Sequence, residues 1–444
     1  MNAYINYLND LTNKNNLQYV GFSTQINWVK YSNAIEYESE KSLLLDKLDH
    51  KLNWSFKNTK PWINRLSKGC QLCGKGEWSC LFITGKCNAN CFYCPTSQNK
   101  DGIPSTQGTS FDNVEDYIQY LDYFGFKGAS LSGGEPLIVF DRTLHYIKSI
   151  KKFFGDKLYL WMYTNGILGS VERYNQLAAA GIDEIRFDIG ATNYDLKYLQ
   201  LAKDIIPNLT VEIPAVPEEF EKLKQVIPEL IKMGVKNMNL HQMRLTNYNA
   251  PKLLNRDYTY LHGEHATVLE SEITALKIIE FVAENNLDIG INYCAFHFKN
   301  RFQKAGFRKK IASKFIDSNS QLTENGFLRT ISHDKSNYTI DNEQLKNTSS
   351  IDPQKNAESI EITYKGLLLD DNEENQLFHK KINIGNKTYF LRSGLVQESQ
   401  SLNQTDTQYF LNLFDKNGAN IPEQENLFLA WKNEFIEWDL RDYF

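Results

Sequence analysis

Over most of its first 300 or so residues, the chain alternates short apolar runs with amphipathic stretches. Apolar runs of strand length recur at residues 80–84, 128–131, 158–162, 184–189, 209–213 and 235–240. Apolar residues spaced by three and four, which predict helices, occupy residues 114–124, 142–154, 171–180, 218–233 and 268–285. Strands that alternate with helices predict βαβ units and a parallel α/β sheet.

The flanking regions have weaker patterns. Residues 1–64 contain one amphipathic stretch, at 35–52, and we expect them to form an N-terminal cap on a core at 65–315. Ser, Asn, Thr and Asp dominate residues 316–355, which predicts a linker or irregular loops. In residues 356–444, runs at 359–364 and 381–391 alternate like half-exposed strands, with a turn at Gly385-Asn386. This part predicts a small, β-rich α+β domain closed by an aromatic tail.

Three cysteines, Cys87, Cys91 and Cys94, stand at CxxxCxxC spacing after the first predicted strand. A cubane iron–sulfur cluster of the ferredoxin type takes four thiolates, so three leave one iron open to an outside ligand. A zinc site is the main alternative, beside a disulfide set or chance. Zinc usually needs four protein ligands, and no HxxxH motif completes this set.

With an aromatic residue before its last cysteine, this run resembles the motif of the radical S-adenosylmethionine (SAM) superfamily. Downstream, Ser132-Gly133-Gly134-Glu135-Pro136 looks like the GGEP motif of that superfamily. The resemblance implies a partial (β/α)6 barrel, and a [4Fe-4S] cluster whose open iron binds SAM. Over residues 65–310 the chain also resembles proteins described as related to glycyl-radical activating enzymes.

The resemblance also implies roles for single residues. Backbone groups of Ser132, Gly133 and Gly134, together with Glu135, would hold the amino group of SAM, and Tyr93 would lie against its adenine. Ribose hydroxyls would be within reach of residues at later strand ends, namely Thr164, Asn165 and Asp188. Residues 211–215 lack the GxIxGxxE pattern of the superfamily, so the floor of the adenine site is not assigned.

Other polar residues stand at predicted strand ends, where barrel enzymes place their chemistry. They are Glu212, Asn239 and His241. The simpler interpretation makes Asp188 a helix cap or turn residue and His241 a surface histidine.

Four further cysteines predict a second metal site. Cys70 and Cys73 form a CxxC pair flanked by glycines, and Cys294 follows a possible seventh strand at 287–293. The site could hold an auxiliary [4Fe-4S] cluster or a zinc ion. Cys80 is its weakest member, since it begins the first strand. The alternative is that all four are free buried thiols.

Composition narrows the class of protein. The chain has 444 residues, seven cysteines and a net charge of −5. We find no apolar run long enough for a membrane span and no signal peptide, so we expect a cytoplasmic protein with reduced thiols and no membrane partner. Residues 296–310 interleave aromatic and basic residues, a pattern that can bind RNA. In an acidic chain it favours a helix with buried phenylalanines, so nucleic acid is not favoured as a partner.

Together, these features predict a radical SAM enzyme. The resemblance implies that a one-electron reductant, such as flavodoxin or ferredoxin, reduces the cluster, that SAM is cleaved to a 5′-deoxyadenosyl radical, and that the radical removes hydrogen from a substrate. We expect a protein or peptide substrate. The alternatives are an RNA-modifying enzyme, a small-molecule enzyme, or a metal-binding protein of the same fold without activity.

Overall fold

The computed structural model describes residues 2–333, 360–371, 378–402 and 421–443. The chain divides into two compact units. The larger unit consists of Leu11–Lys299 and Asp439–Phe444, and the smaller of Met1–Asp10 and Asn300–Trp438. Each unit is described by itself.

A sheet of seven parallel strands forms the centre of the larger unit. In spatial order, the strands are β13 (Gly290–Cys294), β10 (Val235–His241), β9 (Leu209–Pro214), β8 (Glu184–Phe187), β7 (Tyr159–Thr164), β6 (Gly128–Gly133) and β3 (Trp78–Thr84). All six predicted strands and the predicted seventh are present. The end strands β3 and β13 pair with other partners instead of with each other, so the barrel is partial.

Short antiparallel strands continue the sheet at both ends. On one side are β2 (Lys60–Ile63) and β1 (Asn53–Ser55), and on the other β4 (Ser105–Thr106) and β5 (Thr109–Ser110). Residues 53–63 therefore extend the sheet, whereas the sequence led us to expect a cap over residues 1–64. Strands of three and four residues are too short for their alternation to be recognised in the sequence. The rest of this region forms α1 (Ala3–Gln18), η1 (Val20–Phe22) and α2 (Tyr31–Leu48).

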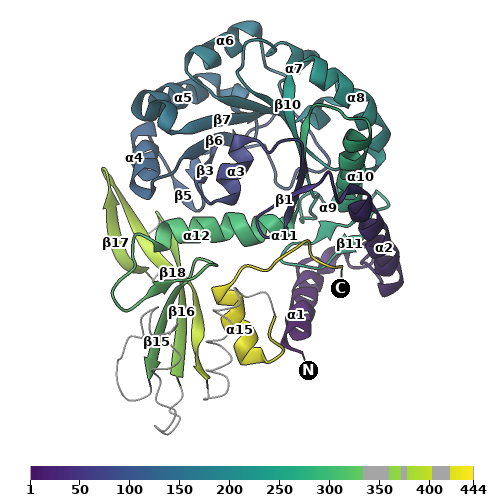
Figure 1. Cartoon of the computed structure of the whole chain (residues 1–444). Coiled ribbons are helices and arrows are strands. Elements are labelled where there is room, and N and C mark those ends of the chain that lie inside the picture. Colours follow the sequence, from purple (N-terminus) through teal and green to yellow (C-terminus); the bar gives the residue numbers. More distant parts are fainter. Residues whose placement is uncertain (1, 334–359, 372–377, 403–420, 444) are drawn as a thin grey trace. The chain divides into compact units, whose positions relative to one another are not determined.

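Helices cover the outer side of the curved sheet (Figure 1). The long ones are α4 (Val114–Phe124), α5 (Phe140–Phe154), α6 (Val171–Ala179), α8 (Phe220–Lys232) and α10 (Glu270–Glu284). Local sequence fixes their ends. The Asn113 side chain accepts a hydrogen bond from Asp116 N at the start of α4, and Gly125 ends that helix at a φ of 64°, which costs glycine little.

One short helix, α3 (Lys68–Gly74), lies on the inner side of the sheet (Figure 1). The Ser67 side chain caps its N-terminus by accepting a hydrogen bond from Cys70 N. A Cβ on Gly128 would stand 2.9 Å from the Leu72 side chain, so Leu72 packs directly onto β6. This helix brings the CxxC pair inside the partial barrel.

Short elements complete the connections. In the larger unit they are η2 (Pro136–Val139), η3 (Gly155–Lys157), η4 (Ile189–Thr192), α7 (Lys197–Gln200), η5 (Pro217–Glu219), α9 (Ala250–Leu253), β11 (Tyr260–Leu261), β12 (Thr267–Val268) and α11 (Phe296–Phe298). Among the described residues, none of the helices combines the length and apolarity needed to cross a membrane.

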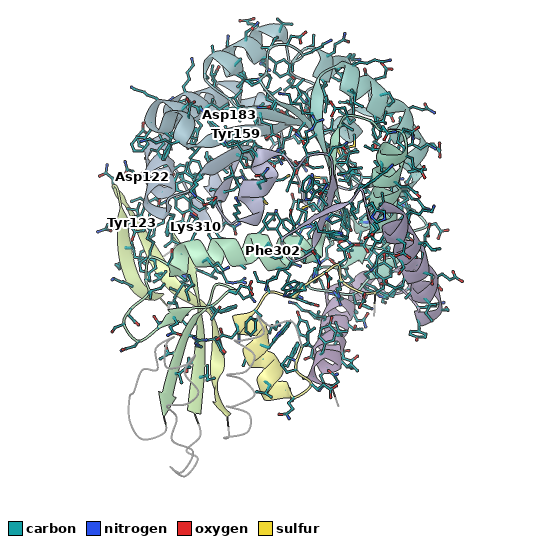
Figure 2. All side chains as sticks on the ribbon, in the orientation of Figure 1. Asp122, Tyr123, Tyr159, Asp183, Phe302 and Lys310 are labelled. Atoms are coloured by element: carbon teal, nitrogen blue, oxygen red, sulfur yellow. The ribbon has the colours of Figure 1, made fainter. Side chains whose placement is uncertain are left out.

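The basic aromatic segment is helical, as its phenylalanine spacing predicts. Phe298 is fully buried, Phe302 lies in the π-helical turn η6 (Lys299–Gln303), and Lys310 lies in α12 (Lys304–Ala312) (Figure 2). Arg308 donates hydrogen bonds to Asn325 O. The absence of a nucleic-acid partner stays a prediction.

An antiparallel sheet dominates the smaller unit. Its order is β14 (Gln321–Leu322), β15 (Leu328–His333), β16 (Ile360–Asp370), β18 (Lys387–Leu402) and β17 (Phe378–Ile384). The predicted turn joins β17 to β18, with Gly385 at a φ of 59°. Two strands, β14 and β15, fall in the predicted linker, where polar residues obscured a short alternation. Residues 334–355 of that linker lie outside the described residues.

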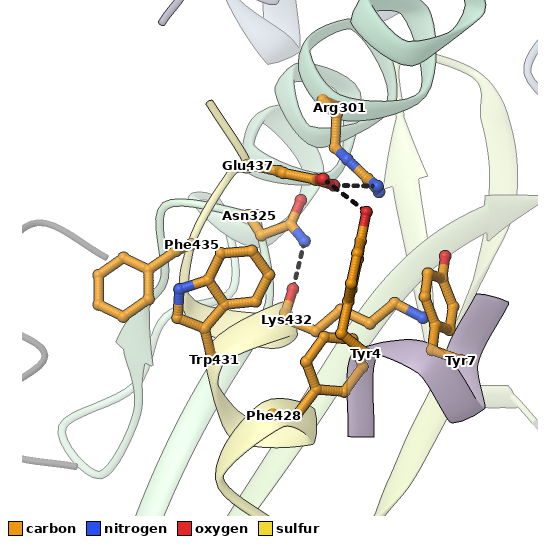
Figure 3. Close-up of a pocket in the computed structure, with 9 residues that line it drawn as sticks. All are labelled: Tyr4, Tyr7, Arg301, Asn325, Phe428, Trp431, Lys432, Phe435 and Glu437. Carbon is orange, nitrogen blue, oxygen red and sulfur yellow. Dashed lines mark hydrogen bonds and ion pairs between the residues drawn. The ribbon is translucent and has the colours of Figure 1, made fainter. Parts of the chain in front are cut away.

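A small pocket occurs beside α15 (Glu425–Glu434) in this unit (Figure 3). Its volume is about 10 Å³, which is room for one water at most. Its polar groups bind one another. Glu437 accepts a hydrogen bond from Tyr4 Oη at 3.3 Å and pairs with Arg301, while Lys432 Nζ lies 3.9 Å from the centre of the Tyr7 ring. This pocket is therefore part of the packing of the unit.

Candidate functional site

The three clustered cysteines occupy a loop that begins directly after β3. Cys87 N donates to Gln98 O at 3.0 Å, which closes the base of the loop. All three cysteines are half-buried, and their sulfurs are close enough to influence one another electrostatically. Burial raises the pKa of Cys91 to about 12, and it also raises the pKa values of Cys87 and Cys94. Metal binding would therefore release protons from these thiols.

A pair of glycines brings the end of β6 against this loop. Gly134 N donates to Thr84 O at 2.9 Å and Glu135 N donates to Lys86 O at 2.7 Å. A Cβ on Gly133, whose φ is 117°, would stand 2.2 Å from Thr84 O, and one on Gly134 would stand 1.9 Å from Lys86 O. Only glycine permits so close an approach of two backbones.

Glu135 lies buried beneath the cysteine loop. Its Oε1 accepts hydrogen bonds from Thr164 Oγ1 at 2.7 Å and Leu137 N at 2.9 Å, and its Oε2 accepts one from Asn165 N at 2.7 Å. Burial raises the pKa of Glu135 to about 7, although these donors oppose the rise. The predicted residues Glu135, Thr164 and Asn165 are thus joined in one network.

Asn165 connects this network to the cysteines. Its Nδ2 donates to Asn88 Oδ1 at 2.8 Å and lies 3.7 Å from Cys87 Sγ. The strand end of β7 therefore touches both the glutamate and the first thiol. A hydrogen bond to sulfur stabilises the thiolate that a metal would need.

Two further predicted site residues, Tyr93 and Asp188, contact each other. Tyr93 Oη donates to Asp188 Oδ1 at 2.8 Å. Asp188 also accepts a hydrogen bond from Ala191 N and caps η4, so the simpler interpretation of this residue as a cap also describes it. Burial raises the pKa of Asp188 to about 6, against the opposing effect of the Tyr93 hydroxyl.

The Ser132 side chain has a different neighbour. Hydrogen bonds with Ser130 and Ser132 act on the thiol of Cys80, while burial raises the pKa of that thiol to about 11. Ser132 pairs with Phe82 in the strand register, which places it beside β3.

Sequence reasoning missed the segment that follows β10. Thr246 Oγ1 donates to Pro95 O at 2.9 Å, Asn249 Nδ2 donates to Tyr93 O at 3.2 Å, and Lys252 Nζ donates to Asn90 Oδ1 at 2.5 Å. These three bonds hold the cysteine loop from outside. No sequence motif indicates these bonds. Each acceptor is a backbone carbonyl or an asparagine side chain about 150 residues away from its donor in the sequence.

The inner face of the sheet also carries a buried ion network that the sequence did not predict. Arg186 Nε lies 3.0 Å from Glu184 Oε1, and Arg186 Nη1 lies 2.7 Å from Glu212 Oε2. The guanidinium stacks near the Trp161 ring, with 5.0 Å between the Arg186 Cζ and the ring centre. Within this network, each buried charge has a neighbour of opposite sign.

Three of the four remaining cysteines interact electrostatically with another buried cation, Lys60. The ammonium of Lys60 interacts with the sulfurs of Cys294, Cys70 and Cys73, in that order of strength. Cys70 also lies 3.9 Å from Arg186 Nη1. Cys80 differs, since the groups that act on its thiol are the hydroxyls of Ser130 and Ser132 and the charges of Glu212 and Arg186. The second metal site stays a prediction.

Within the described part of the chain, no three His, Cys, Asp or Glu side chains meet closely enough to bind one shared metal ion. Each thiolate of a four-iron cluster binds a separate iron, so this kind of site does not require a shared point. The three neighbouring thiols of the loop, Cys87, Cys91 and Cys94, supply the chemistry that such a cluster needs.

Comparison with known proteins finds matches to the part of the chain that contains this site. A family model described as the radical SAM superfamily matches residues 81–247. A protein of Methanocaldococcus jannaschii, provisionally named a glycyl-radical enzyme activating enzyme, is 33% identical over 279 residues, which cover 60% of this chain and 72% of that protein.

Other matches are less similar in sequence. A protein of Methanothermobacter thermautotrophicus, provisionally named a GTP 3′,8-cyclase, is 28% identical over 172 residues, and the chain spans only 48% of its length. Among solved structures, Streptococcus suis SuiB bound to precursor peptide SuiA matches with a TM-score of 0.38 and 11% identity, over 64% of this chain and 65% of that one.

Proposed function

Because the chain belongs to the radical SAM superfamily, we propose that it is an enzyme that removes a hydrogen atom from a protein or peptide substrate. The observation that carries the proposal is the connection between the cysteine loop and Glu135 at the strand ends of a partial barrel. Asn165 makes this connection, because its backbone N donates to Glu135 and its side chain lies 3.7 Å from Cys87 Sγ. The provisional name of its 33% identical relative supports a protein substrate.

Cys87, Cys91 and Cys94 would hold a [4Fe-4S] cluster, and Ser132–Glu135, Tyr93, Thr164, Asn165 and Asp188 would bind SAM around it. When bound, the cluster and SAM supply an electron transfer and a radical that abstracts hydrogen. The protein positions such a cofactor and excludes competing reactions. A one-electron reductant of the flavodoxin or ferredoxin type would be the partner.

The contribution of the chain is to fix these groups in advance. Three donors hold the Glu135 carboxylate, so the carboxylate needs no rearrangement when it receives a cation such as the ammonium of SAM. The bond between Tyr93 and Asp188 fixes a carboxylate from a second strand end. Because Gly133 and Gly134 have no side chains, their backbone can lie close to the cysteine loop.

Two alternatives keep the same chemistry and change the substrate. The similarity to proteins provisionally named GTP 3′,8-cyclases favours a small molecule, but it extends over 38% of this chain. An RNA substrate has only the basic aromatic segment in its favour, and part of that segment is buried. A second cluster or a zinc ion stays a prediction.

The test is anaerobic reconstitution followed by reduction with dithionite in the presence of SAM. The native chain should contain about four irons at this site and should form 5′-deoxyadenosine. Cys91→Ala should abolish both, while Cys80→Ala, a matched change of a thiol outside the loop, should preserve both. Cluster-loaded native protein that binds SAM without cleaving it would overturn the proposal in favour of a binding protein.

The substrate class has its own measurement. With candidate peptides deuterated at carbon, turnover should move deuterium from the peptide into 5′-deoxyadenosine, as measured by mass spectrometry. Transfer from a deuterated nucleoside triphosphate, and from no peptide, would favour the small-molecule alternative.

A further inference from the structure

Two cationic side chains meet around one phenylalanine just beyond the C-terminal ends of β10 and β13. Arg244 follows β10, and Phe296 and Lys299 follow β13. The Arg244 Cζ lies 5.5 Å from the centre of the Phe296 ring, and the Lys299 Nζ lies 4.8 Å from it. Barrel enzymes bind their substrates at this end of the strands, so the two cations stand on the side from which a substrate would enter.

Hydrogen bonds fix the position of this pair. The residues before and after Arg244 bond to residues 268 and 266 through backbone hydrogen bonds of 2.9 Å. Phe296 N donates to the Gln242 side chain at 3.0 Å, which ties the segment after β13 to the segment after β10. The aromatic ring and the arginine therefore belong to one rigid arrangement.

One side chain connects Arg244 to the cysteine loop. Asn249 Nδ2 donates to Arg244 O at 3.0 Å and to Tyr93 O at 3.2 Å. The backbone of Arg244 therefore has a fixed position relative to the loop that carries the three clustered thiols.

The two cations have no acidic partner. Within the described residues, neither the Arg244 guanidinium nor the Lys299 ammonium takes part in an ion pair or a side-chain hydrogen bond, although both side chains are half-buried. Burial lowers the pKa of Arg244, and the opposing effect comes from Tyr19 and not from a carboxylate. Two like charges beside one ring also repel each other. An anion would satisfy the N–H donors and compensate both charges.

A second arginine in the same part of the chain shows the usual arrangement. The Arg256 Cζ lies 3.6 Å from the centre of the Phe92 ring, and Arg256 also pairs with the Glu218 carboxylate. Both arginines therefore contact a phenylalanine, but of the two, as far as the structure describes the chain, Arg256 alone has a carboxylate. Contact with a ring leaves the N–H donors in the plane of the guanidinium able to bind an acceptor. At Arg244 that acceptor can come from another molecule.

We propose that Arg244 and Lys299 bind a carboxylate of the peptide substrate, with Phe296 as the aromatic surface that holds both cations. The guanidinium binds both oxygens of a carboxylate side by side, and the ammonium adds a less directional contact. The assignment to a peptide rests on the proposed function, whereas the affinity for a carboxylate does not. The substrate peptide would carry an acidic side chain or a free C-terminus at this position.

The experiment follows the reaction of phenylglyoxal with single arginines in the full, cluster-loaded chain, under anaerobic conditions and without SAM. Peptide mass spectrometry gives the rates for Arg244 and for Arg256, the internal control. The probes are acetyl-Gly-Glu-Glu-Gly-amide, the neutral acetyl-Gly-Gln-Gln-Gly-amide, and the neutral sequence with a free C-terminus. No SAM cleavage is needed, so this inference and the proposed function can fail separately.

At saturation, a charged peptide should slow the reaction of Arg244 at least about threefold, since a bound carboxylate occupies the guanidinium donors. The rate at Arg256 should not change, and the neutral amide should not protect Arg244. Protection by the glutamate peptide assigns the site to an acidic side chain, and protection by the free C-terminus assigns it to a chain end.

Lys299→Gln is the diagnostic variant, because it removes one charge and leaves Arg244 in place. It should raise the peptide concentration for half-protection at least about fivefold, whereas Lys148→Gln, a matched change of an exposed lysine on α5, should not. Equal effects of charged and neutral peptides, or no effect of Lys299→Gln, would overturn the proposal. Equal protection by SAM alone would overturn it in favour of a SAM contact. Protection by inorganic phosphate or GTP, and by neither charged peptide, would overturn it in favour of a phosphorylated substrate.

Discussion

Replacing Gly134 by alanine tests whether close backbone contact assembles the site. The added Cβ would stand 1.9 Å from Lys86 O, and real Cβ atoms essentially never come within 3.0 Å of such a neighbour. The two segments must therefore separate by at least about 1.1 Å, the difference between these distances. Both partners are backbone, so no side chain can turn aside. Overpacking of this kind costs about 1–3 kcal/mol.

The displacement matters more than the cost, because it separates the cysteine loop from Glu135. Misplacement by about 1 Å can lower activity by roughly 100-fold. We expect Gly134→Ala to retain the fold, with a melting temperature lower by a few degrees, and to lose most 5′-deoxyadenosine formation. Iron content, SAM affinity and product formation after reconstitution are the measurements.

Two glycine variants serve as controls. A Cβ on Gly102 meets nothing within 4 Å, so Gly102→Ala should leave every measurement unchanged. Gly125 also has space but adopts a φ of 64°, so Gly125→Ala should lower stability by roughly 1 kcal/mol and preserve the cluster. If Gly134→Ala binds iron and cleaves SAM like the native chain, close contact at this glycine is not what assembles the site.

Two further predictions concern buried charge. Arg186→Met leaves Glu184 and Glu212 without the guanidinium between them and should lower the free energy of unfolding by roughly 3–5 kcal/mol. The measurement is chemical denaturation, and a loss below about 1 kcal/mol would contradict the ion network. Burial raises the pKa of Glu135 from 4.5 to about 7, so its contribution to the stability of metal-free protein is complete below about pH 4.5 and lost as the pH rises through about 7. The stability lost over this pH range is at most roughly 3 kcal/mol. Glu135→Gln should remove this pH dependence. If the free energy of unfolding varies with pH equally in the native chain and the variant, this account is refuted.

The strands and helices of the barrel could be predicted because their signals are local. Each parallel strand is buried on both faces and therefore reads as an apolar run, and the predicted helix at 114–124 coincides with α4 (Val114–Phe124). The edge strands β1 and β2 gave no such signal. The strands β14 and β15 were hidden by the polar residues around them.

The sequence nominated candidate site residues where a motif groups several of them within a few positions. The cysteine loop and the GGEP run are of this kind, and the structure brings both together with Thr164 and Asn165. The hydrogen bonds from Thr246, Asn249 and Lys252 to the cysteine loop were not predictable. Each joins residues about 150 positions apart in the sequence and involves no unusual residue type. Such contacts depend on the fold as a whole.

The inner face of the sheet explains why Glu184 and Arg186 were not predicted as part of a polar network. Side chains alternate between the two faces of a strand, and polar residues recur at alternate positions in parts of β8, β9 and β10. Glu184 and Arg186, Glu212, and Asn239 occupy this inward set. Within a short apolar run, a single polar residue looks like an interruption of the core. Because burial of an uncompensated charge is costly, inward polar residues on adjacent strands must pair, as Arg186 pairs with Glu184 and Glu212. Polar residues at alternate positions of neighbouring strands therefore indicate a network of paired polar side chains inside the barrel. The last inward-facing residue of each strand, just before the following loop, is the one placed to meet a substrate.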